Sequence, residues 1–587
     1  MRLENGIPYA TDFADIYHSA DGAGEVQRVF IQPSGLAAVG LADDPLWVGE
    51  LGFGSGLNFA VLAEQCIRQR RRLHFVSCDA APLSPQDFSR VAAGRTAELS
   101  IYQALDRAYP PLISGWHRRY LADGLITLSL HWGDAQTALN HLARQESRPF
   151  RAWFLDGFAP DRNPQMWSEA LLSLVGRLSA AQTTVATFTA AGRVRRGLQA
   201  AGFEMRRVDQ RPHKRESLAG FYKGESVPNA AAPSRAVVLG AGLAGASVAR
   251  QLAQRDVQVS VLEAGPAPAS GASGIAVSML HPRLLANASD EARLRCHAYL
   301  YSAAFVASFV AEPPDFTGAL QLPGKNATEA RLQAIAGHYQ DSGGWLAPLN
   351  QPEAEQFTGW TLNSGGLWFP QSQPIDMSAL CRKLLDHPNI ELRCNAPVQA
   401  LADADEVPVV LACAAACRDF PPASYLELAA VQGQIDIVRP GALPKAAMLG
   451  NGYVVPWGDK LALGSTYEYS PWENGRATRE NLAQLPVGQR SNIRWLERSR
   501  GTRCVSSDRL PIVGAIYDRD QRAIANLFVS TAMGSMGNVF SHYAGELLAS
   551  QICGEFPPAT RELQAALSSL RFRQRQERRG HRLDSRP

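Results

Sequence analysis

Short apolar runs that end at glycines or at an acidic residue recur along this chain. In the first third they cover residues 47–51, 73–78, 125–131 and 152–155, with helical segments between them. Such runs predict buried strands. Strands that alternate with helices indicate a parallel sheet whose ligands lie at the carboxyl ends of the strands.

The same pattern begins again in the middle of the chain, where a glycine-rich turn joins two apolar strands. Gly240 allows the tight turn, Gly242 lets the backbone approach a pyrophosphate, and Gly245 lets helix and strand pack closely. Glu263 ends the second strand, where a carboxylate accepts hydrogen bonds from a ribose. The segment predicts a bound adenine dinucleotide; a coincidental glycine-rich turn is the alternative.

A different glycine-rich turn follows the first strand of the chain. In ELGFGSGLN, residues 50–58, an acid precedes alternating glycines, so a ligand can lie against bare backbone while the acid reaches an amino group. Three later strands each end beside an aspartate. Any one of these can be a helix N-cap, but the three together favour a cofactor site. The candidates are Glu50, Gly52, Gly54, Gly56, Asp79, Asp134 and Asp156.

This succession of motifs resembles the class I S-adenosylmethionine-dependent methyltransferases, which implies a Rossmann-like domain. The resemblance assigns the three glycines to the amino-acid end of the cofactor, Asp79 to its ribose and Asp134 to its adenine side. Asp156 would face the transferred methyl group. A carboxylate there would accept a proton from an amine nucleophile or orient it.

Motifs downstream of the central fingerprint resemble the glycine oxidase and D-amino-acid oxidase superfamily of FAD enzymes. The resemblance implies an α/β and α+β architecture, a carboxylate clamp at Arg503 and a substrate-site tyrosine at Tyr453. A structural salt bridge and a plain sheet position are the alternatives for these two. A strand pair over residues 389–398 would carry Val398 to the adenine. The further cofactor candidates are Gly271, Ser273, Gly534 and Gly537.

One segment departs from the family pattern. Residues 409–415, VVLACAA, lack the glycine that the family has in a cofactor-facing turn. We therefore leave the cofactor contact of this turn open.

The length of 587 residues exceeds what one core supports. We expect a methyltransferase domain at 1–224, a linker at 225–234, an oxidoreductase domain at 235–560 and a basic tail at 561–587. The tail holds eight arginines against three acidic residues. The tail fits a flexible arm that contacts phosphates or a solvated terminus. The cations at 211–215 fit either contact with a polyanionic substrate or an ordinary surface.

Composition excludes several classes of protein. No apolar run reaches 18 residues, and the N-terminus lacks the features of a signal peptide, so we expect neither a membrane span nor secretion. The nine cysteines include no CxxC pair. This favours free thiols, a cytoplasmic location and no metal site.

Taken whole, the chain resembles the bifunctional enzymes that modify the wobble uridine of tRNA. The most specific matches are residues 50–59, 153–167 and 188–203. The resemblance implies FAD-dependent removal of a carboxymethyl group from the side chain of uridine 34, then methylation of the resulting amine. The partner would be the anticodon stem-loop of tRNA. A fused enzyme acting on a free small amino acid, and a non-catalytic RNA-binding scaffold, are the alternatives.

Overall fold

The computed structural model describes most of the chain. The residues outside the description are 1, 5–6, 12–14, 18–20, 37–44, 146–148, 213–214, 226–231, 310–317, 326, 402–406, 471, 474, 491 and 581–587. The central part of the expected linker, and two of the cations at 211–215, fall among them. Within the described part, no helix has the length and apolarity that a bilayer span requires.

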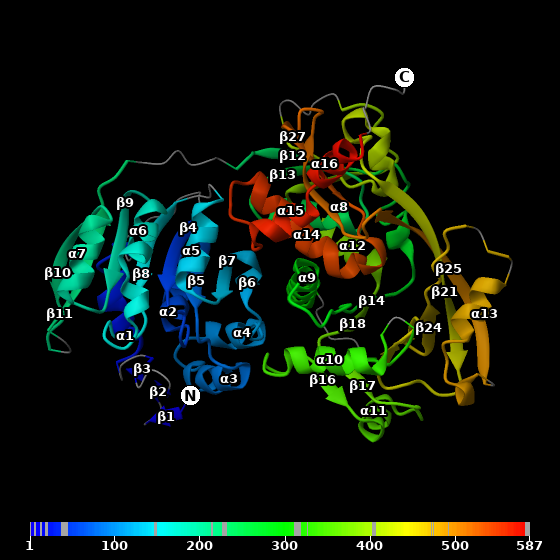
Figure 1. Ribbon diagram of the computed structural model, residues 1–587, viewed down its shortest axis with the longest axis horizontal. Coiled ribbons are helices and arrows are strands. Elements are labelled where there is room, and N and C mark those ends of the chain that lie inside the picture. The colour runs from blue at the N-terminus through cyan, green and yellow to red at the C-terminus, as the bar shows by residue number, and fades with distance from the viewer. Residues whose placement is uncertain are drawn as a thin grey trace. The chain divides into compact units, whose positions relative to one another are not determined.

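The chain divides into two compact units, which we describe separately (Figure 1). Unit 1 is Met1–Ala231 with Gly554–Thr560, and unit 2 is Ala232–Cys553 with Arg561–Pro587. The division differs from the expected boundaries at residues 554–560. Phe556 explains the difference, because its side chain is fully buried in the core of unit 1 against Trp47 and Trp116.

Unit 1 is built on an eight-stranded sheet in the order β10-β11-β9-β8-β4-β5-β7-β6, whose five central strands are parallel. The strands are β4 (Leu46–Leu51), β5 (Leu73–Asp79), β6 (Gly115–Leu121), β7 (Ile126–Trp132), β8 (Phe150–Leu155), β9 (Ser179–Thr187), β10 (Phe203–Asp209) and β11 (Glu216–Tyr222). A small sheet of β1 (Arg2–Glu4), β2 (Ile7–Ala10) and β3 (Asp15–Ile16) precedes it.

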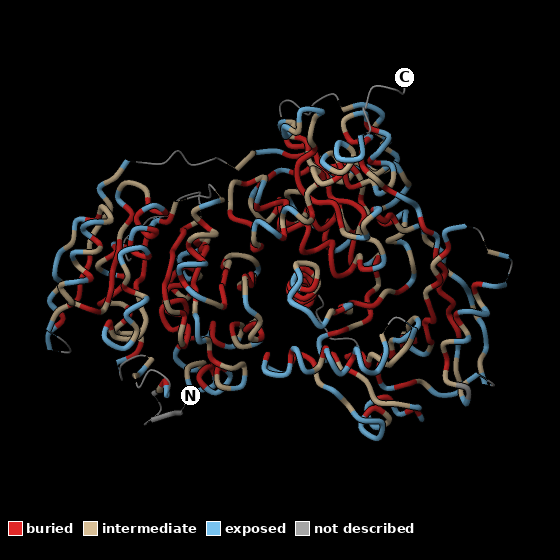
Figure 2. The backbone as a smooth tube through the Cα atoms, in the orientation of Figure 1, coloured by how far each residue is buried: buried red, intermediate tan, exposed pale blue. Residues whose placement is uncertain are grey.

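Helices cover both faces of this sheet, because its strands are apolar on both sides. Val48 and Phe75 face one core, whereas Trp47 and Val76 face the other. The first core packs against α1 (Ala23–Val26), α2 (Leu57–Arg68), α3 (Pro85–Arg95) and α4 (Ile101–Ala108). The second packs against α5 (Ala135–Ala143), α6 (Glu169–Arg177) and α7 (Gly192–Ala200). Figure 2 shows the sheet as the buried layer.

Unit 2 contains two large sheets. The first has the order β19-β13-β12-β20-β27-β26 and is parallel except for β26. Its strands are β12 (Arg235–Leu239), β13 (Gln258–Leu262), β19 (Ile390–Arg393), β20 (Val409–Leu411), β26 (Ile512–Tyr517) and β27 (Ala523–Thr531). Its helices include α8 (Leu243–Ala253), α9 (Asp290–Ala307), α12 (Met377–Leu385) and α14 (Gly537–Ile552).

The second sheet of unit 2 is mostly antiparallel, in the order β16-β17-β15-β22-β23-β24-β21-β25. Its strands are β15 (Ala319–Gln321), β16 (Ala347–Leu349), β17 (Gly366–Phe369), β21 (Leu428–Pro440), β22 (Ala447–Leu449), β23 (Tyr453–Trp457), β24 (Lys460–Gly464) and β25 (Ile493–Ser506). The pair β14 (Ser278–Leu280) and β18 (Gln373–Ile375) stands apart, and further helices are α10 (Glu329–Tyr339), α11 (Gln351–Thr358) and α13 (Arg476–Leu482). The predicted α/β and α+β classes are confirmed.

Two local expectations are wrong. Residues 389–398 do not form a strand pair: β19 ends at Arg393, and Asn395 adopts a φ of +52°. The chain instead turns there, with the N–H groups of Asn395 and Ala396 bonded to the carbonyls of Gly265 and Glu263.

The basic tail is neither an arm nor a frayed end over residues 561–580. It forms α15 (Arg561–Leu567) and α16 (Leu570–Arg578), and Phe572 is fully buried. Arg571 and Arg575 each lie 2.9 Å from Asp508 and pair with it. These arginines therefore anchor a turn of unit 2.

Candidate functional sites

A cavity of about 860 Å³ opens at the carboxyl ends of β4, β5, β7 and β8 in unit 1. Each predicted aspartate ends one of these strands or starts the turn after it, so parallel strand order gathers all three at one edge. The predicted residues that line the cavity are Gly52, Gly54, Asp79, Asp134 and Asp156.

Asp79 shapes the glycine-rich turn. Its carboxylate accepts hydrogen bonds from Gly54 N at 2.8 Å and from Ala81 N at 2.9 Å. Burial raises the pKa of Asp79, and these two bonds lower it in part. At Gly52, with a φ of +94°, a Cβ would lie 2.7 Å from the carbonyl oxygen of Asp156. The turn therefore requires glycine there, and a ligand meets bare backbone.

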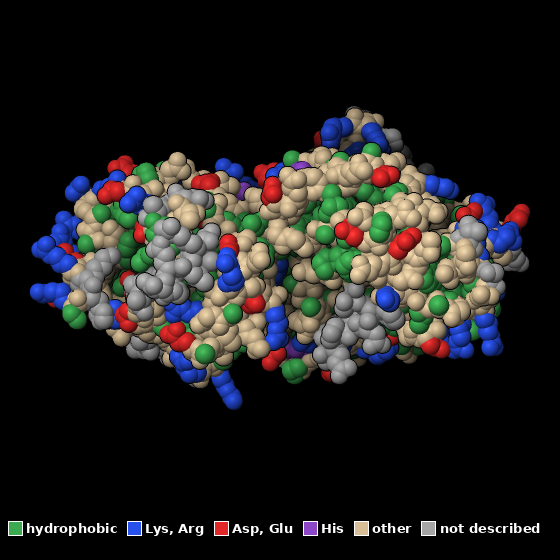
Figure 3. All heavy atoms as spheres, turned by 90° about the horizontal axis from the view of Figure 1, so that it is seen from below, with side chains coloured by type: hydrophobic (Ala, Val, Ile, Leu, Met, Phe, Trp, Pro, Cys, Tyr) green, Lys and Arg blue, Asp and Glu red, His purple; other side chains and the backbone are tan. Residues whose placement is uncertain are grey.

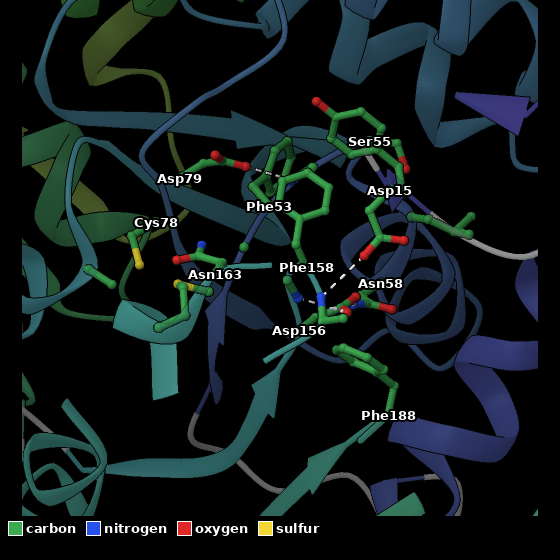
Figure 4. A pocket seen from close by; sticks show the side chains of 18 of the residues that line it. Asp15, Phe53, Ser55, Asn58, Cys78, Asp79, Asp156, Phe158, Asn163 and Phe188 are labelled. Atoms are coloured by element: carbon green, nitrogen blue, oxygen red, sulfur yellow. Dashed lines mark hydrogen bonds between the residues drawn. The ribbon is translucent and has the colours of Figure 1, made fainter. Parts of the chain in front are cut away.

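Asp156 is held by a side chain that the sequence did not single out (Figure 4). Asn58 Nδ2, at the start of α2, donates to Asp156 Oδ2 at 2.7 Å and to Glu50 Oε1 at 2.9 Å. Gly157 N donates to the other oxygen of Asp156 at 2.9 Å. These bonds fix the carboxylate in the cavity wall.

Glu50 is placed differently from the expected direct contact with an amino group. It is only 2% exposed and lies behind the cavity wall, where Ser77 Oγ donates to it at 2.7 Å. Burial raises the pKa of Glu50 well above its ordinary value, and the charge of Asp156 adds to this effect. In this structure its carboxylate accepts hydrogen bonds from Asn58 and Ser77.

Asp134 has two roles in the structure. It lines the cavity, and it caps α5 by accepting hydrogen bonds from Gln136 N and Thr137 N, both at 2.9 Å. Its partial burial raises its pKa, but hydrogen bonds from Thr137 and Gln136 outweigh this and leave the pKa below its ordinary value. Gly56 is the N-cap residue before α2, with a φ of +73°, and does not line the cavity.

Several cavity residues of unit 1 were not among the predicted site residues. They come from the small N-terminal sheet and from the loops after β8 and β9. Asp15 Oδ2 accepts a bond from Ala159 N at 3.2 Å, which ties the N-terminal sheet to the loop of Asp156. The aromatic rings of Tyr17 and Phe158 pack edge to face beside it. Phe188 and Asn163 complete the wall (Figure 4).

A second cavity, of about 670 Å³, lies in unit 2 along the central glycine turn. It brings together residues that are nearly 300 positions apart in the sequence. The predicted residues that line it are Gly240, Gly242, Glu263, Gly271, Ser273, Val398, Tyr453, Arg503, Gly534 and Gly537.

The turn before α8 is fixed by Glu263. Its carboxylate accepts hydrogen bonds from Ala241 N at 2.7 Å and from Gly265 N at 2.8 Å. Ser273 Oγ accepts another from Leu243 N at 3.0 Å. Gly245 does not line the cavity; it lies against Gly240, as its predicted packing role requires.

Two glycines of this turn should respond differently to substitution. At Gly245 a Cβ would lie 1.9 Å from the carbonyl oxygen of Gly240, so Gly245→Ala should lower the unfolding free energy by about 1–3 kcal/mol. At Gly242 the nearest atom is Ser273 Oγ at 3.4 Å, so Gly242→Ala should fold normally yet bind a dinucleotide more weakly. Thermal unfolding of both variants tests this; equal melting temperatures would contradict it.

Arg503 and Tyr453 form the polar end of this cavity. Arg503 reaches it from β25, and its Nη1 donates to the carbonyl of Thr466 at 3.0 Å. Burial lowers the pKa of Arg503 and raises that of Tyr453. At Gly433 a Cβ would lie 2.2 Å from Arg503 Nη1, so this glycine makes room for the guanidinium.

Asn538, which was not among the predicted site residues, has an amide side chain suited to a polar ligand. It is 3% exposed and lines the cavity at the start of α14. Among the described residues, neither its Nδ2 nor its Oδ1 has a hydrogen-bond partner. A buried amide without partners is costly, so the site fits a cofactor with both donors and acceptors, as the flavin group of FAD has.

The turn without the family glycine still reaches the cavity. Ala412, Cys413 and Ala414 line it, and Ala414 adopts a φ of +55°, the region that favours glycine. Cys413 Sγ lies 3.6 Å from the buried Cys417 Sγ, and both are free thiols. Within the described residues, no three His, Cys, Asp or Glu side chains converge as a metal site would need.

Comparison with known proteins matches both units to enzyme families. Residues 97–223 match an S-adenosyl-L-methionine-dependent methyltransferase family, and residues 235–551 match an FAD-dependent oxidoreductase family. The chain is thus an enzyme whose cofactors are S-adenosylmethionine and FAD. Glycine oxidase from Geobacillus kaustophilus aligns with a TM-score of 0.47 and 21% identity, over 57% of this chain and 98% of that one.

Relatives with both units align over nearly the whole length. The tRNA 5-methylaminomethyl-2-thiouridine biosynthesis bifunctional protein MnmC of Azoarcus sp. (strain BH72) is 33% identical over 97% of this chain and 96% of its own. The protein of that name from Pseudomonas aeruginosa (strain UCBPP-PA14) is 34% identical over 99% and 98%. The chain therefore belongs to the family of bifunctional MnmC proteins.

Proposed function

We propose that this enzyme carries out two successive reactions on the side chain of the wobble uridine, position 34, of cytoplasmic tRNA. Unit 2 oxidises the 5-carboxymethylaminomethyl group, with or without a 2-thio group, to the 5-aminomethyl form. Unit 1 then methylates the primary amine to the 5-methylaminomethyl form. The observation that carries the proposal is that one chain holds Arg503 in one cofactor cavity and Asp156 in the other.

The first substrate is an N-substituted glycine, and the polar end of the unit 2 cavity suits its carboxylate. Arg503 offers a planar fork of donors that can hold a carboxylate bidentately. That hold positions the neighbouring methylene group. The bond between this methylene carbon and the amine nitrogen is oxidised to an imine, with the loss of two electrons and two protons. Water then adds to the imine carbon, and the carbon–nitrogen bond breaks to release glyoxylate and leave the primary amine. FAD, when bound, accepts the two electrons.

The second substrate is a primary amine, which must lose a proton before its lone pair can attack. Asp156 is held by Asn58 and Gly157 and is placed to accept that proton or to orient the amine. Phe158 and Phe188 line the same cavity. Such rings can pack against an uncharged base. S-adenosylmethionine, when bound, supplies the methyl group.

A comparison of substrates tests the proposal against its main alternative, an enzyme for free amino acids. The purified enzyme should oxidise undermodified tRNA with a kcat/KM at least about 100-fold above that for sarcosine, since RNA contacts add binding energy. Equal or better use of sarcosine would favour the free amino acid. A purified protein with no flavin absorbance would favour a non-catalytic scaffold.

A further inference from the structure

Two tyrosines lie beside Arg503 but outside the lining of the unit 2 cavity. They follow β24 in an extended segment, so Tyr467 and Tyr469 share one side while Glu468 points to the other. Glu468 is 1% exposed and is paired with Arg500 at 2.6 Å. Tyr469 is 61% exposed, which is unusual for a large aromatic side chain.

The rings and the arginines form a continuous set of contacts that begins at the cavity. The guanidinium of Arg503 lies 5.6 Å from the centre of the Tyr467 ring. The Tyr467 and Tyr469 rings are 5.3 Å apart. Arg509 lies 5.8 Å from the first ring and 5.7 Å from the second. Arg503 therefore contacts the first ring, and Arg509 contacts both rings.

The turn that carries Arg509 leaves its guanidinium without a carboxylate partner among the described residues. Arg509 adopts a φ of +68°, and the neighbouring Asp508 is occupied by Arg571 and Arg575 of α16. Asp508 is therefore not the partner of Arg509, and within the described part of the chain no carboxylate pairs with Arg509. The charge at this position is left for a ligand.

A further arginine adds to the positive charge near these rings. Arg283 is exposed and lies close enough to Arg503 and Tyr467 for their charges to interact. An exposed aromatic ring beside an arginine without a carboxylate partner matches the chemistry of single-stranded RNA, whose bases stack and whose phosphates are anionic. A protein partner would not require this excess of positive charge.

We propose that Tyr467, Tyr469 and Arg509 form a docking surface for a nucleotide next to the modified uridine in the single-stranded anticodon loop. The base stacks on the exposed Tyr469 ring and Arg509 faces its phosphate, which leaves the uridine side chain free to reach Arg503. This inference rests on the proposed function and specifies which part of the enzyme recognises the RNA around the reacting group.

The test uses the full-length flavin-containing enzyme and an anticodon stem-loop RNA with 2-aminopurine beside the modified uridine. Stacking quenches 2-aminopurine fluorescence, so binding to the unaltered enzyme should quench it. Tyr469→Ala should abolish the quench and raise the KM for the RNA about ten-fold. Tyr469→Trp, which keeps an aromatic ring, should retain the fluorescence quench and the KM of the unaltered enzyme. Flavin absorbance confirms that each variant is folded.

Phe357→Ala is the matched control, because Phe357 is also an exposed aromatic residue of unit 2, at 42%, and lies outside the cavity wall on α11. It should behave as the unaltered enzyme does. An equal quench and an equal KM in Tyr469→Ala would overturn the docking surface while the proposed function stands. Failure of the unaltered enzyme to convert any tRNA would instead overturn the proposed function.

Discussion

Replacing Asp156 by alanine should stop the reaction sequence at the 5-aminomethyl nucleoside. Methylation should slow by about 10²–10⁴-fold, the usual contribution of a positioned proton acceptor. Asn58 would also lose one of its two acceptors, so the wall of the cavity would loosen as well. The check is mass spectrometry of the nucleosides formed from tRNA in the presence of S-adenosylmethionine.

Asp161→Ala provides the matched control. Asp161 lies five residues further along the same loop, but its side chain is 97% exposed and pairs with Arg193 at the surface. This variant should methylate normally. Asp156→Asn separates the two roles of the carboxylate, since an amide can orient an amine but cannot take its proton. Normal amounts of the methylated product from Asp156→Ala would show that the role assigned to Asp156 is wrong.

Replacing Arg503 by alanine should stop the sequence one stage earlier, at the 5-carboxymethylaminomethyl nucleoside. Two charge-assisted hydrogen bonds to the substrate carboxylate are lost, each worth about 2 kcal/mol. Their loss should lower kcat/KM for oxidation by about 10³-fold. Stopped-flow measurement of flavin reduction by tRNA substrate gives this number directly.

Arg498→Ala is the control for this variant. Arg498 lies on the same strand, β25, and is exposed outside the cavity. Its loss should leave the rate of flavin reduction unchanged. Unchanged oxidation by Arg503→Ala would show that Arg503 does not bind the substrate carboxylate. The KM of Arg503→Ala should also rise, because ground-state binding of the carboxylate uses the same donors.

The sequence allowed most of the predicted residues that line the two cavities to be named, because glycines and acids at strand ends are local signals. Parallel pairing of β4, β5, β7 and β8 then brings Asp79, Asp134 and Asp156 to one cavity without further information. Likewise the glycines before α8 and α14 meet in one cavity because β12 and β27 both pair with β20.

Other features depend on contacts between distant parts of the chain, which local patterns do not record. Glu50 looks like a ligand in sequence, yet its environment in the sheet turns it toward Asn58 and Ser77. Asn538 gave no signal because only its burial without partners marks it. Residues 554–560 join unit 1 through Phe556, whose burial could not be read from seven residues.

Charge along the chain was likewise a poor guide to the structure of the tail. The arginine-rich tail suggested an arm, but Arg571 and Arg575 are used to anchor the turn at Asp508. On the face shown in Figure 3, the Lys and Arg side chains of the described residues are mixed with Asp and Glu side chains. The docking surface proposed at Tyr469 emerged only from the arrangement of rings and arginines in space.

The central claim is that one chain performs both reactions in sequence on the same amine of tRNA. Nucleoside mass spectrometry of undermodified tRNA, incubated with the enzyme with and without S-adenosylmethionine, tests it most directly. Without S-adenosylmethionine the 5-aminomethyl nucleoside should accumulate, and with it the 5-methylaminomethyl nucleoside should replace it. A tRNA that keeps its carboxymethylaminomethyl group under both conditions would contradict the account.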